Sequence, residues 1–182
     1  MTTPAPTVFA TDRMIARPWQ LADARSALEL YGDPEVVRYI GGVAEPDLDA
    51  MRARLAGILE RDRAGPPGMG SFPCFARDDG RQVGTAIIRP LPDVRGQLTQ
   101  DIEIGWHLAR REWGQGYATE MGRELLRYGF AELGLERLHA LVEPPNLASL
   151  AVARRLGMRE QGVTRRYYDG RELLHLLRAA GD

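Results

Sequence analysis

The sequence predicts an α/β (α+β) protein built on one mixed, mostly antiparallel sheet. Three apolar runs, residues 72–77, 83–90 and 100–109, are separated by short turn-forming segments, the pattern of an antiparallel meander. The third run leads into a helical pattern over residues 117–133 and then into a strand pattern over 137–143. Such a strand–helix–strand unit places its two strands parallel. We therefore expect about seven strands, about four flanking helices and one parallel pair near the centre.

Local patterns predict the elements of the N-terminal half. Residues 9–18 are typical of a first strand, and residues 21–31 of a helix. Asp33-Pro34 begins a short turn or helix that continues to Tyr39. The next helix, over 47–63, is terminated by Gly65-Pro66-Pro67-Gly68. Its apolar residues recur at helical spacing: Leu48, Met51, Leu55, Ile58 and Leu59.

The C-terminal half follows from similar signals. Gly134 is well placed to end the helix over 117–133. Residues 137–143 alternate as a strand does, and residues 147–156 form a further helix that ends before Gly157. Residues 159–166 and 172–179 are expected to pair as a hairpin across Asp169-Gly170.

Composition limits the class of protein. A length of 182 residues suits one domain over residues 1–182, in which we expect residues 1–7 to form a flexible tail. The net charge of -1, with 24 basic residues spread along the chain, predicts no nucleic-acid partner. No apolar run reaches membrane-spanning length, and the N-terminus does not resemble a signal peptide, so we expect a cytoplasmic protein without a membrane partner. The single cysteine, Cys74, lies in an apolar run and is expected to be a buried thiol.

The segment between Ala109 and Tyr117 has the order expected of an anion-binding loop. A strand leads into Gly114 and Gly116, and a helix follows directly. Unpaired amides at the start of a helix favour an anion, and glycine lets the backbone approach it closely. The alternative is an ordinary strand-to-helix turn with two glycines. No Lys-Ser or Lys-Thr follows the glycines, which disfavours a nucleotide kinase. Thr119 stands where a dinucleotide-binding motif needs glycine, which disfavours an NAD enzyme.

At this loop the chain resembles a known family. Arg111-x-x-Gly114-x-Gly116, followed by Tyr-Ala-Thr-Glu, resembles the acetyl-CoA signature of the GNAT superfamily of N-acetyltransferases. Glu103-Ile-Gly-Trp precedes the loop, Asn146-x-x-Ser149 opens the next helix, and Leu156-Gly157-Met158 ends it. The start of the chain, with Thr-Asp-Arg at 11–13 and Asp-Pro-Glu-Val at 33–36, resembles the RimJ/RimL-type branch, the ribosomal-protein N-terminal acetyltransferases.

The resemblance implies acetyl-CoA as co-substrate, held between two splayed parallel strands of a GNAT-type sheet. The backbone of His107, Leu108 and Ala109 would pair with the pantetheine arm and could offer an N–H to the thioester oxygen. Gly105 is then a position for the bulge that opens the strands. The residues implied to bind the cofactor are His107, Leu108, Ala109, Arg111, Trp113, Gly114, Gln115, Gly116, Tyr117, Ala118, Thr119, Asn146 and Ser149.

Two residues are candidates for catalysis. Glu103 lies four residues before His107, where many family members carry a glutamate that acts as general base. Its alternative role is a solvated strand residue or the partner of an arginine. Ser149 is the candidate that protonates, or hydrogen-bonds, the leaving thiolate. Many members instead carry a tyrosine at the position of Ala153. The alternative for Ser149 is a local backbone bond, and Asn146 could serve as an N-cap.

The remaining polar residues suggest no further site. The three histidines, His107, His139 and His175, fall on separate predicted strands, and no cluster has metal-ligand spacing, so we predict no metal. Two interpretations apply to Tyr167 and Tyr168, which either line the acceptor groove or pack as ordinary strand aromatics.

The resemblance thus predicts transfer of the acetyl group from acetyl-CoA to a primary amine by direct attack in a ternary complex. The acceptor, a protein N-terminus or a small molecule, stays open, as does the choice between monomer and homodimer. The alternative is a catalytically inactive acyl-CoA-binding sensor or scaffold of the same fold.

Overall fold

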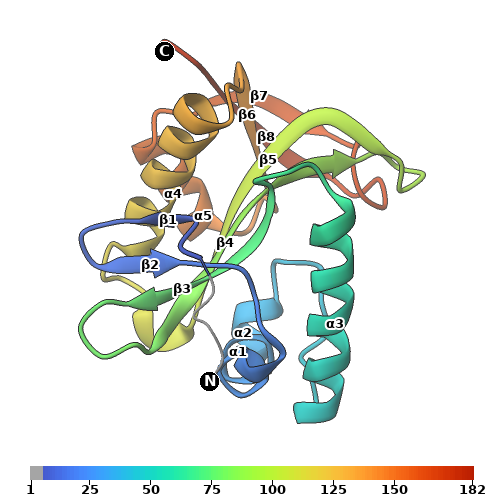
Figure 1. Cartoon of the computed structure of the whole chain (residues 1–182). Coiled ribbons are helices and arrows are strands. Elements are labelled where there is room, and N and C mark those ends of the chain that lie inside the picture. The colour runs from blue at the N-terminus through green and yellow to red at the C-terminus, as the bar shows by residue number, and fades with distance from the viewer. Residues whose placement is uncertain (1–5) are drawn as a thin grey trace. The chain divides into compact units, whose positions relative to one another are not determined.

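A mixed eight-stranded sheet runs through the chain in the order β1-β2-β3-β4-β5-β6-β8-β7. The structure is a computed structural model that describes residues 6–182, so the expected tail at residues 1–7 lies mostly outside the described part (Figure 1). The strands are β1 (Phe9–Ala10), β2 (Met14–Ala16), β3 (Gly70–Ala76), β4 (Gln82–Pro92), β5 (Leu98–Leu108), β6 (Arg137–Val142), β7 (Arg159–Thr164) and β8 (Leu173–Ala179).

The chain divides into two units, each of which is described by itself. The first comprises residues 1–86 and 106–117, and the second residues 87–105 and 118–182. Strands β4 and β5 run through both. The first unit contains β1, β2 and β3, and the second contains β6, β7 and β8.

The expected single strand over residues 9–18 is wrong. It is a two-stranded hairpin, in which Phe9 pairs with Ala16 and Ala10 with Ile15. Thr11 causes the reversal, because its amide donates to the Met14 carbonyl and its hydroxyl accepts from the Met14 amide, both at 2.9 Å. This extra hairpin gives eight strands in the described residues where about seven were expected.

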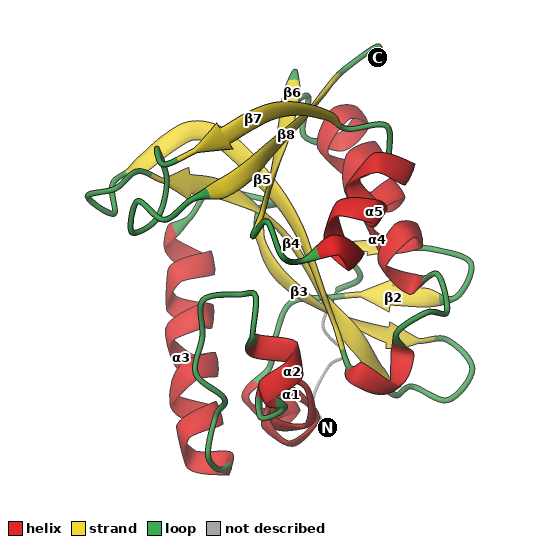
Figure 2. Ribbon diagram, turned by 180° about the vertical axis from the view of Figure 1, so that it is seen from behind, coloured by secondary structure: helices red, strands yellow, loops and turns green. Residues whose placement is uncertain are grey.

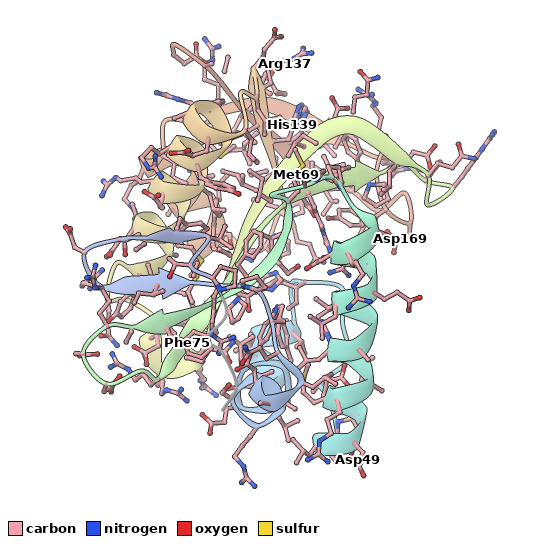
Figure 3. All side chains as sticks on the ribbon, in the orientation of Figure 1. Asp49, Met69, Phe75, Arg137, His139 and Asp169 are labelled. Carbon is pink, nitrogen blue, oxygen red and sulfur yellow. The ribbon has the colours of Figure 1, made fainter. Side chains whose placement is uncertain are left out.

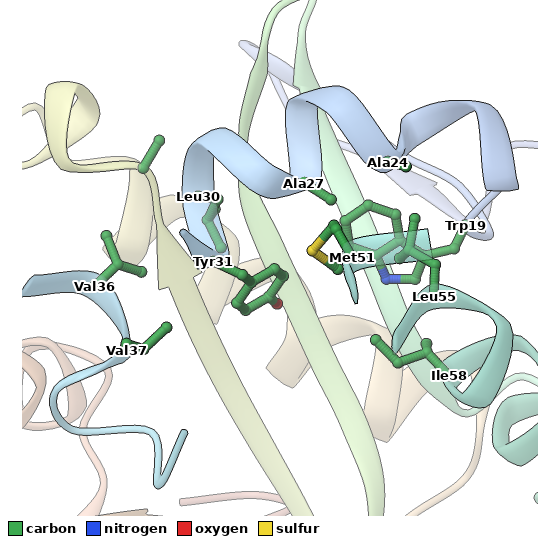
Figure 4. Packing of buried hydrophobic residues seen from close by; sticks show 11 residues of the cluster. Trp19, Ala24, Ala27, Leu30, Tyr31, Val36, Val37, Met51, Leu55 and Ile58 are labelled. Carbon is green, nitrogen blue, oxygen red and sulfur yellow. The ribbon is translucent and has the colours of Figure 1, made fainter. Parts of the chain in front are cut away.

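Three helices of the first unit enclose a hydrophobic cluster: α1 (Ala24–Tyr31), α2 (Pro34–Val37) and α3 (Leu48–Ala64) (Figure 4). Asp47 caps α3, and its carboxylate accepts from the amides of residues 49 and 50. Met51, Leu55 and Ile58 recur on one face of α3 and are buried in the cluster. Each such side chain contributes about 1.5–3 kcal/mol through burial.

The second unit contains the parallel pair that the sequence predicts. Glu103 of β5 lies opposite His139 of β6, and the two strands run parallel. Between them lies α4 (Tyr117–Arg127), which continues as a single π-helical segment (Tyr128–Glu132). Gly134 follows with a φ of 65°, the left-handed conformation expected of a helix-ending glycine.

The last elements complete the sheet. Strand β8 pairs antiparallel with β7, as the predicted C-terminal hairpin requires, and it also pairs antiparallel with β6. Helix α5 (Leu147–Arg155) packs beside α4, since a Cβ added at Gly122 would lie 2.4 Å from Leu156, the C-cap of α5 (Figure 2). The described residues thus hold five α-helices where about four were expected, because Asp33 caps a separate short helix at Pro34.

Candidate active site

The glycine-containing loop has the backbone geometry that the sequence predicts. After β5 the chain forms a 3-10 turn (Arg110–Glu112), and α4 begins at Tyr117. Gly114 and Gly116 have φ values of 74° and 83°, in the left-handed region that favours glycine. Residues 113–116 are exposed, and a Cβ at Gly114 would meet nothing within 4 Å. The loop therefore leaves open space directly before a helix N-terminus, which fits an anionic group such as a pyrophosphate.

A buried carboxylate anchors the base of this loop. Glu112 is 2% exposed and lies 3.0 Å from Nε of Arg81 and 3.3 Å from Nε of Arg111. Arg81 also donates to the Tyr117 hydroxyl at 3.3 Å. These contacts tie both ends of the loop to the end of the β3–β4 hairpin, so the exposed glycines are held by a fixed frame.

The Arg111 side chain already binds other groups of the protein. Its guanidinium lies 3.0 Å from the Glu29 carboxylate and donates to the Gln82 carbonyl at 3.2 Å. Its backbone carbonyl in turn accepts from the Gln115 side chain at 2.8 Å. The side chain thus braces the loop, and a direct contact with a phosphate stays a prediction.

Sequence reasoning assigned no role to Arg13, which the fold brings to the loop. Its Nη1 donates to the Gln115 carbonyl at 3.1 Å, and its guanidinium lies 4.1 Å from the centre of the Tyr117 ring. The two partners of the first bond are 102 residues apart. Nothing in the local sequence signals this contact, because it depends on the position of the β1–β2 hairpin.

The end of β5 carries the backbone segment predicted to pair with a pantetheine arm. His107 Nδ1 lies 3.1 Å from the Tyr31 hydroxyl, and the two rings meet edge to face. Tyr31 also donates to Thr85 at 3.1 Å. The Trp113 indole donates to the Leu108 carbonyl at 3.1 Å. The His107 side chain is therefore packed against Tyr31, and Ala109 is buried in the hydrophobic cluster.

Glu103, in the second unit, is a buried and ion-paired carboxylate. It is 7% exposed, and Nε of Arg89 donates to its Oε1 at 2.8 Å. The Tyr168 hydroxyl lies 2.6 Å from both carboxylate oxygens. Glu103 is therefore not a solvated strand residue. It is the partner of an arginine, one of the alternatives stated above, and this pairing is compatible with a role in accepting a proton.

Tyr168 is unusual among the described residues. It is the only one other than glycine with a positive φ, 55°. Burial, followed by the negative charge of Glu103, raises the pKa of its hydroxyl above the ordinary value. The phenol therefore keeps its proton and remains a hydrogen-bond donor at neutral pH.

A second polar cluster lies beside Glu103 on the sheet. The Tyr167 hydroxyl donates to Asp101 at 2.8 Å, and Nε2 of His139 lies 3.5 Å from the same carboxylate. His139, labelled in Figure 3, stacks on His175, with Nδ1 and Nε2 of the two rings 2.8 Å apart. Two of the three histidines, which lie on separate strands as expected, are thus adjacent in the sheet. Burial lowers the pKa of both.

The start of α5 has the predicted cap. The Asn146 side chain accepts from the Ser149 amide at 3.1 Å, so the N-cap role of Asn146 is confirmed. The Thr119 hydroxyl in α4 accepts from Nε of Arg155 at 3.2 Å. Ala153 is fully buried, and no hydroxyl stands at this position.

Cys74 has the expected structural role. It is fully buried, and burial raises the pKa of its thiol to about 12. It is therefore no nucleophile at neutral pH.

Comparison with known proteins identifies the class to which this fold and loop belong. A match to the GNAT acetyltransferase domain covers residues 13–159, and the chain belongs to this family. It is 29% identical to an uncharacterised N-acetyltransferase, p20, of Bacillus licheniformis, with 86% of this chain and 85% of that protein covered. It is 30% identical to the FsC-acetyl coenzyme A-N(2)-transacetylase of Aspergillus fumigatus, with 87% and 67% covered.

The fold is also that of a solved acetyltransferase in complex with coenzyme A. The ribosomal L7/L12 α-N-protein acetyltransferase RimL superposes with a TM-score of 0.74 over 96% of this chain and 98% of that chain, at 15% identity. Membership of the family makes this chain an acetyl-CoA-dependent N-acetyltransferase. Within residues 6–182, no helix is long and apolar enough to cross a membrane.

Proposed function

We propose that the chain acetylates a primary amine, either a protein N-terminus or a small-molecule amine, by direct attack in a ternary complex with acetyl-CoA. The observation that carries this proposal is the loop at 113–116, with two glycines in left-handed conformation directly before α4, in a member of this family. Acetyl-CoA supplies an activated acetyl group, and most of the rate then comes from holding the amine beside it.

The residues predicted to bind coenzyme A would contact different parts of the cofactor. The amides of Gly114, Gln115 and Gly116 and the start of α4 would bind the pyrophosphate. The backbone of His107, Leu108 and Ala109 would pair with the pantetheine arm as an added strand does. The side chain of Asn146 would contact the same arm. The side chains of Arg111 and Arg13 add positive charge to the loop.

Glu103 is the residue to which we assign the amine proton. A new C–N bond forms as the C–S bond breaks, the nitrogen loses a proton, and the thiolate gains one. Oε1 of Glu103 already accepts from Arg89 and Tyr168, whereas Oε2 accepts from Tyr168. We therefore assign the incoming proton to Oε2, received directly or through a water molecule.

Ser149 is the residue that we assign to the leaving thiolate. It stands in the first turn of α5, and its amide is already bound by Asn146. Its hydroxyl is a neutral donor that can stabilise a developing negative charge on sulfur. The buried Ala153 cannot supply this group, which favours Ser149.

The acceptor class is the finer part of the proposal. RimL acts on a protein N-terminus, as its name states, and the Aspergillus relative is named as an N(2)-transacetylase. We expect this chain to accept an amine of one of these two kinds.

The test is release of free thiol from acetyl-CoA in the presence of a panel of peptides with free N-termini and of small primary amines, with the acetylated product identified by mass spectrometry. We expect turnover with at least one acceptor class. We expect the Glu103→Gln variant to lose about 10²–10⁴-fold in kcat while its affinity for acetyl-CoA stays close to that of the wild type.

Two outcomes would redirect the proposal. Tight binding of acetyl-CoA without turnover on any acceptor supports the alternative of an acyl-CoA sensor. Full turnover by Glu103→Gln across the pH range would remove Glu103 as the base.

A further inference from the structure

We infer that Tyr168 is a positioning residue for this reaction, whose hydroxyl orients the Glu103 carboxylate and keeps it ready to accept the amine proton. The inference rests on the proposed function of Glu103, and it concerns a residue whose role the sequence motifs do not assign.

The contacts of Tyr168 with Glu103 are close and centred. Its one hydroxyl lies 2.6 Å from Oε1 and 2.6 Å from Oε2, so its proton is shared across the carboxylate. Arg89 binds Oε1 from β4 at 2.8 Å. One shared phenol proton and a guanidinium on Oε1 together restrict the rotation of the carboxylate. Charge-assisted hydrogen bonds of this kind are the strong ones in proteins.

The chain holds Tyr168 in an unfavourable backbone conformation to achieve this contact. A φ of 55° costs a residue with a Cβ free energy, and such strain persists only where the surroundings enforce it. The Tyr168 amide donates to the Pro92 carbonyl at 3.1 Å, and the Gly170 amide donates to the Tyr167 carbonyl at 3.1 Å. The preceding Tyr167 is bridged to Asp93 and bound to Asp101. The strained residue is thus held from both sides.

The chemistry of the phenol makes it a donor and not a proton shuttle. Burial and the neighbouring Glu103 charge both raise the pKa of Tyr168, so deprotonation is disfavoured at any neutral pH. A phenol with a raised pKa is a poor source of a proton for a thiolate. Tyr168 therefore does not replace the tyrosine absent at Ala153, and its effect must pass through Glu103.

The groups that surround the Glu103 carboxylate come from four segments. Arg89 lies on β4, and Tyr168 lies in the connection between β7 and β8. Asp101 precedes Glu103 by two residues on β5. His139 on β6 lies opposite Glu103 in the strand register, and its Nε2 faces Asp101. Loss of the Tyr168 hydroxyl would leave the Glu103 carboxylate bound by Arg89 through Oε1, so its orientation would be less firmly fixed.

The experiment compares Tyr168→Phe with Tyr167→Phe. Both variants lose one hydroxyl and keep the ring, but the Tyr167 hydroxyl binds Asp101 and not Glu103. For Tyr168→Phe we expect kcat to fall about ten- to a hundredfold, with KM for acetyl-CoA unchanged. Tyr167 is itself buried, so for Tyr167→Phe we expect a lower Tm, but kcat close to that of the wild type because its hydroxyl does not reach Glu103.

A double-mutant cycle separates positioning from stability. If Tyr168 acts through Glu103, adding Tyr168→Phe to Glu103→Gln should lower kcat no further. An additive loss, or a Tyr168→Phe variant with wild-type kcat, would overturn the inference. Thermal unfolding of each variant shows whether it is folded, and the cycle is read on folded variants. Absence of turnover in the wild type would instead contradict the proposed function.

Discussion

At the residue scale, the carboxylates of the candidate site are paired, with Glu103 and Glu112 buried and Asp101 half-buried. Glu103, Glu112 and Asp101 each lie on or beside β5 or its loop, and each binds an arginine, a tyrosine or a histidine from another element. A carboxylate removed from water is costly unless such partners replace its hydration. The partners therefore offset the cost of removing these carboxylates from water.

The histidine pair makes stability depend on pH. Burial lowers the pKa of His139 and of His175, so the unfolded chain binds more protons than the folded chain just below pH 6.5. Their contribution is present above about pH 6.5, the unfolded value, and is lost as the pH falls through the folded values. We expect the free energy of unfolding, measured in urea, to be lower at pH 5.5 than at pH 7.5.

The His175→Gln variant checks the origin of this pH dependence. Glutamine keeps a polar group beside His139 but does not titrate, so the difference in unfolding free energy between pH 7.5 and 5.5 should become smaller. The m-value should be unchanged, since the same surface is exposed on unfolding. An undiminished difference would assign the pH dependence to other groups.

At the scale of elements, two glycines are subject to different constraints. Gly84 lies at a close contact between two strands, whereas at Gly57 only the helix preference of the residue matters. A Cβ added at Gly84 in β4 would lie 2.1 Å from the His107 carbonyl oxygen of β5, a backbone atom that cannot move without disturbing the strand pair. Gly57 in α3 is exposed, and a Cβ there would meet nothing within 4 Å. The same substitution should therefore have opposite effects at the two positions.

We expect Gly84→Ala to lower the free energy of unfolding by about 3 kcal/mol or more. Gly57→Ala should raise it by about 0.5–1 kcal/mol, because alanine is the better helix former. Urea unfolding of the two variants beside the wild type measures both. A Gly84→Ala variant as stable as the wild type would show that β4 and β5 do not approach as closely as described.

At the scale of the whole molecule, binding of coenzyme A should stabilise the fold. A ligand that binds only the folded chain adds about 2.7 kcal/mol at a hundredfold excess over Kd. For a chain of this size that corresponds to a rise in Tm of roughly 5–10 °C. We expect thermal unfolding to show this rise for coenzyme A and acetyl-CoA.

Gly116→Val should reduce this stabilisation. Valine is strained at the φ of 83° that Gly116 adopts, and its side chain would stand at the exposed face of the loop. The rise in Tm with coenzyme A should fall to a small part of the wild-type value. Gly57→Ala, which is remote in sequence from the loop, is the control and should keep the full rise. An unchanged rise in a folded Gly116→Val variant would argue against the loop as the binding site.

The sequence by itself determined most elements and the donor substrate. The helix over 47–63, the meander and the glycine loop depend on propensities and contacts within a few residues, which local patterns report directly. The prediction of a single strand over 9–18 is wrong because the Thr11 side chain stabilises a reversal of the chain within three residues. The spacing of apolar residues does not indicate such a turn.

Only the tertiary structure decided the partners of the buried charges. The Tyr168–Glu103 bond spans 65 residues, the His139–His175 contact 36, and the Arg13–Gln115 bond 102. Such pairs depend on strand register and on the order of strands in the sheet, and no local window contains both members. Glu103 could therefore be selected from the sequence as a carboxylate, whereas its fixed and ion-paired state required the fold that brings Arg89 and Tyr168 to it.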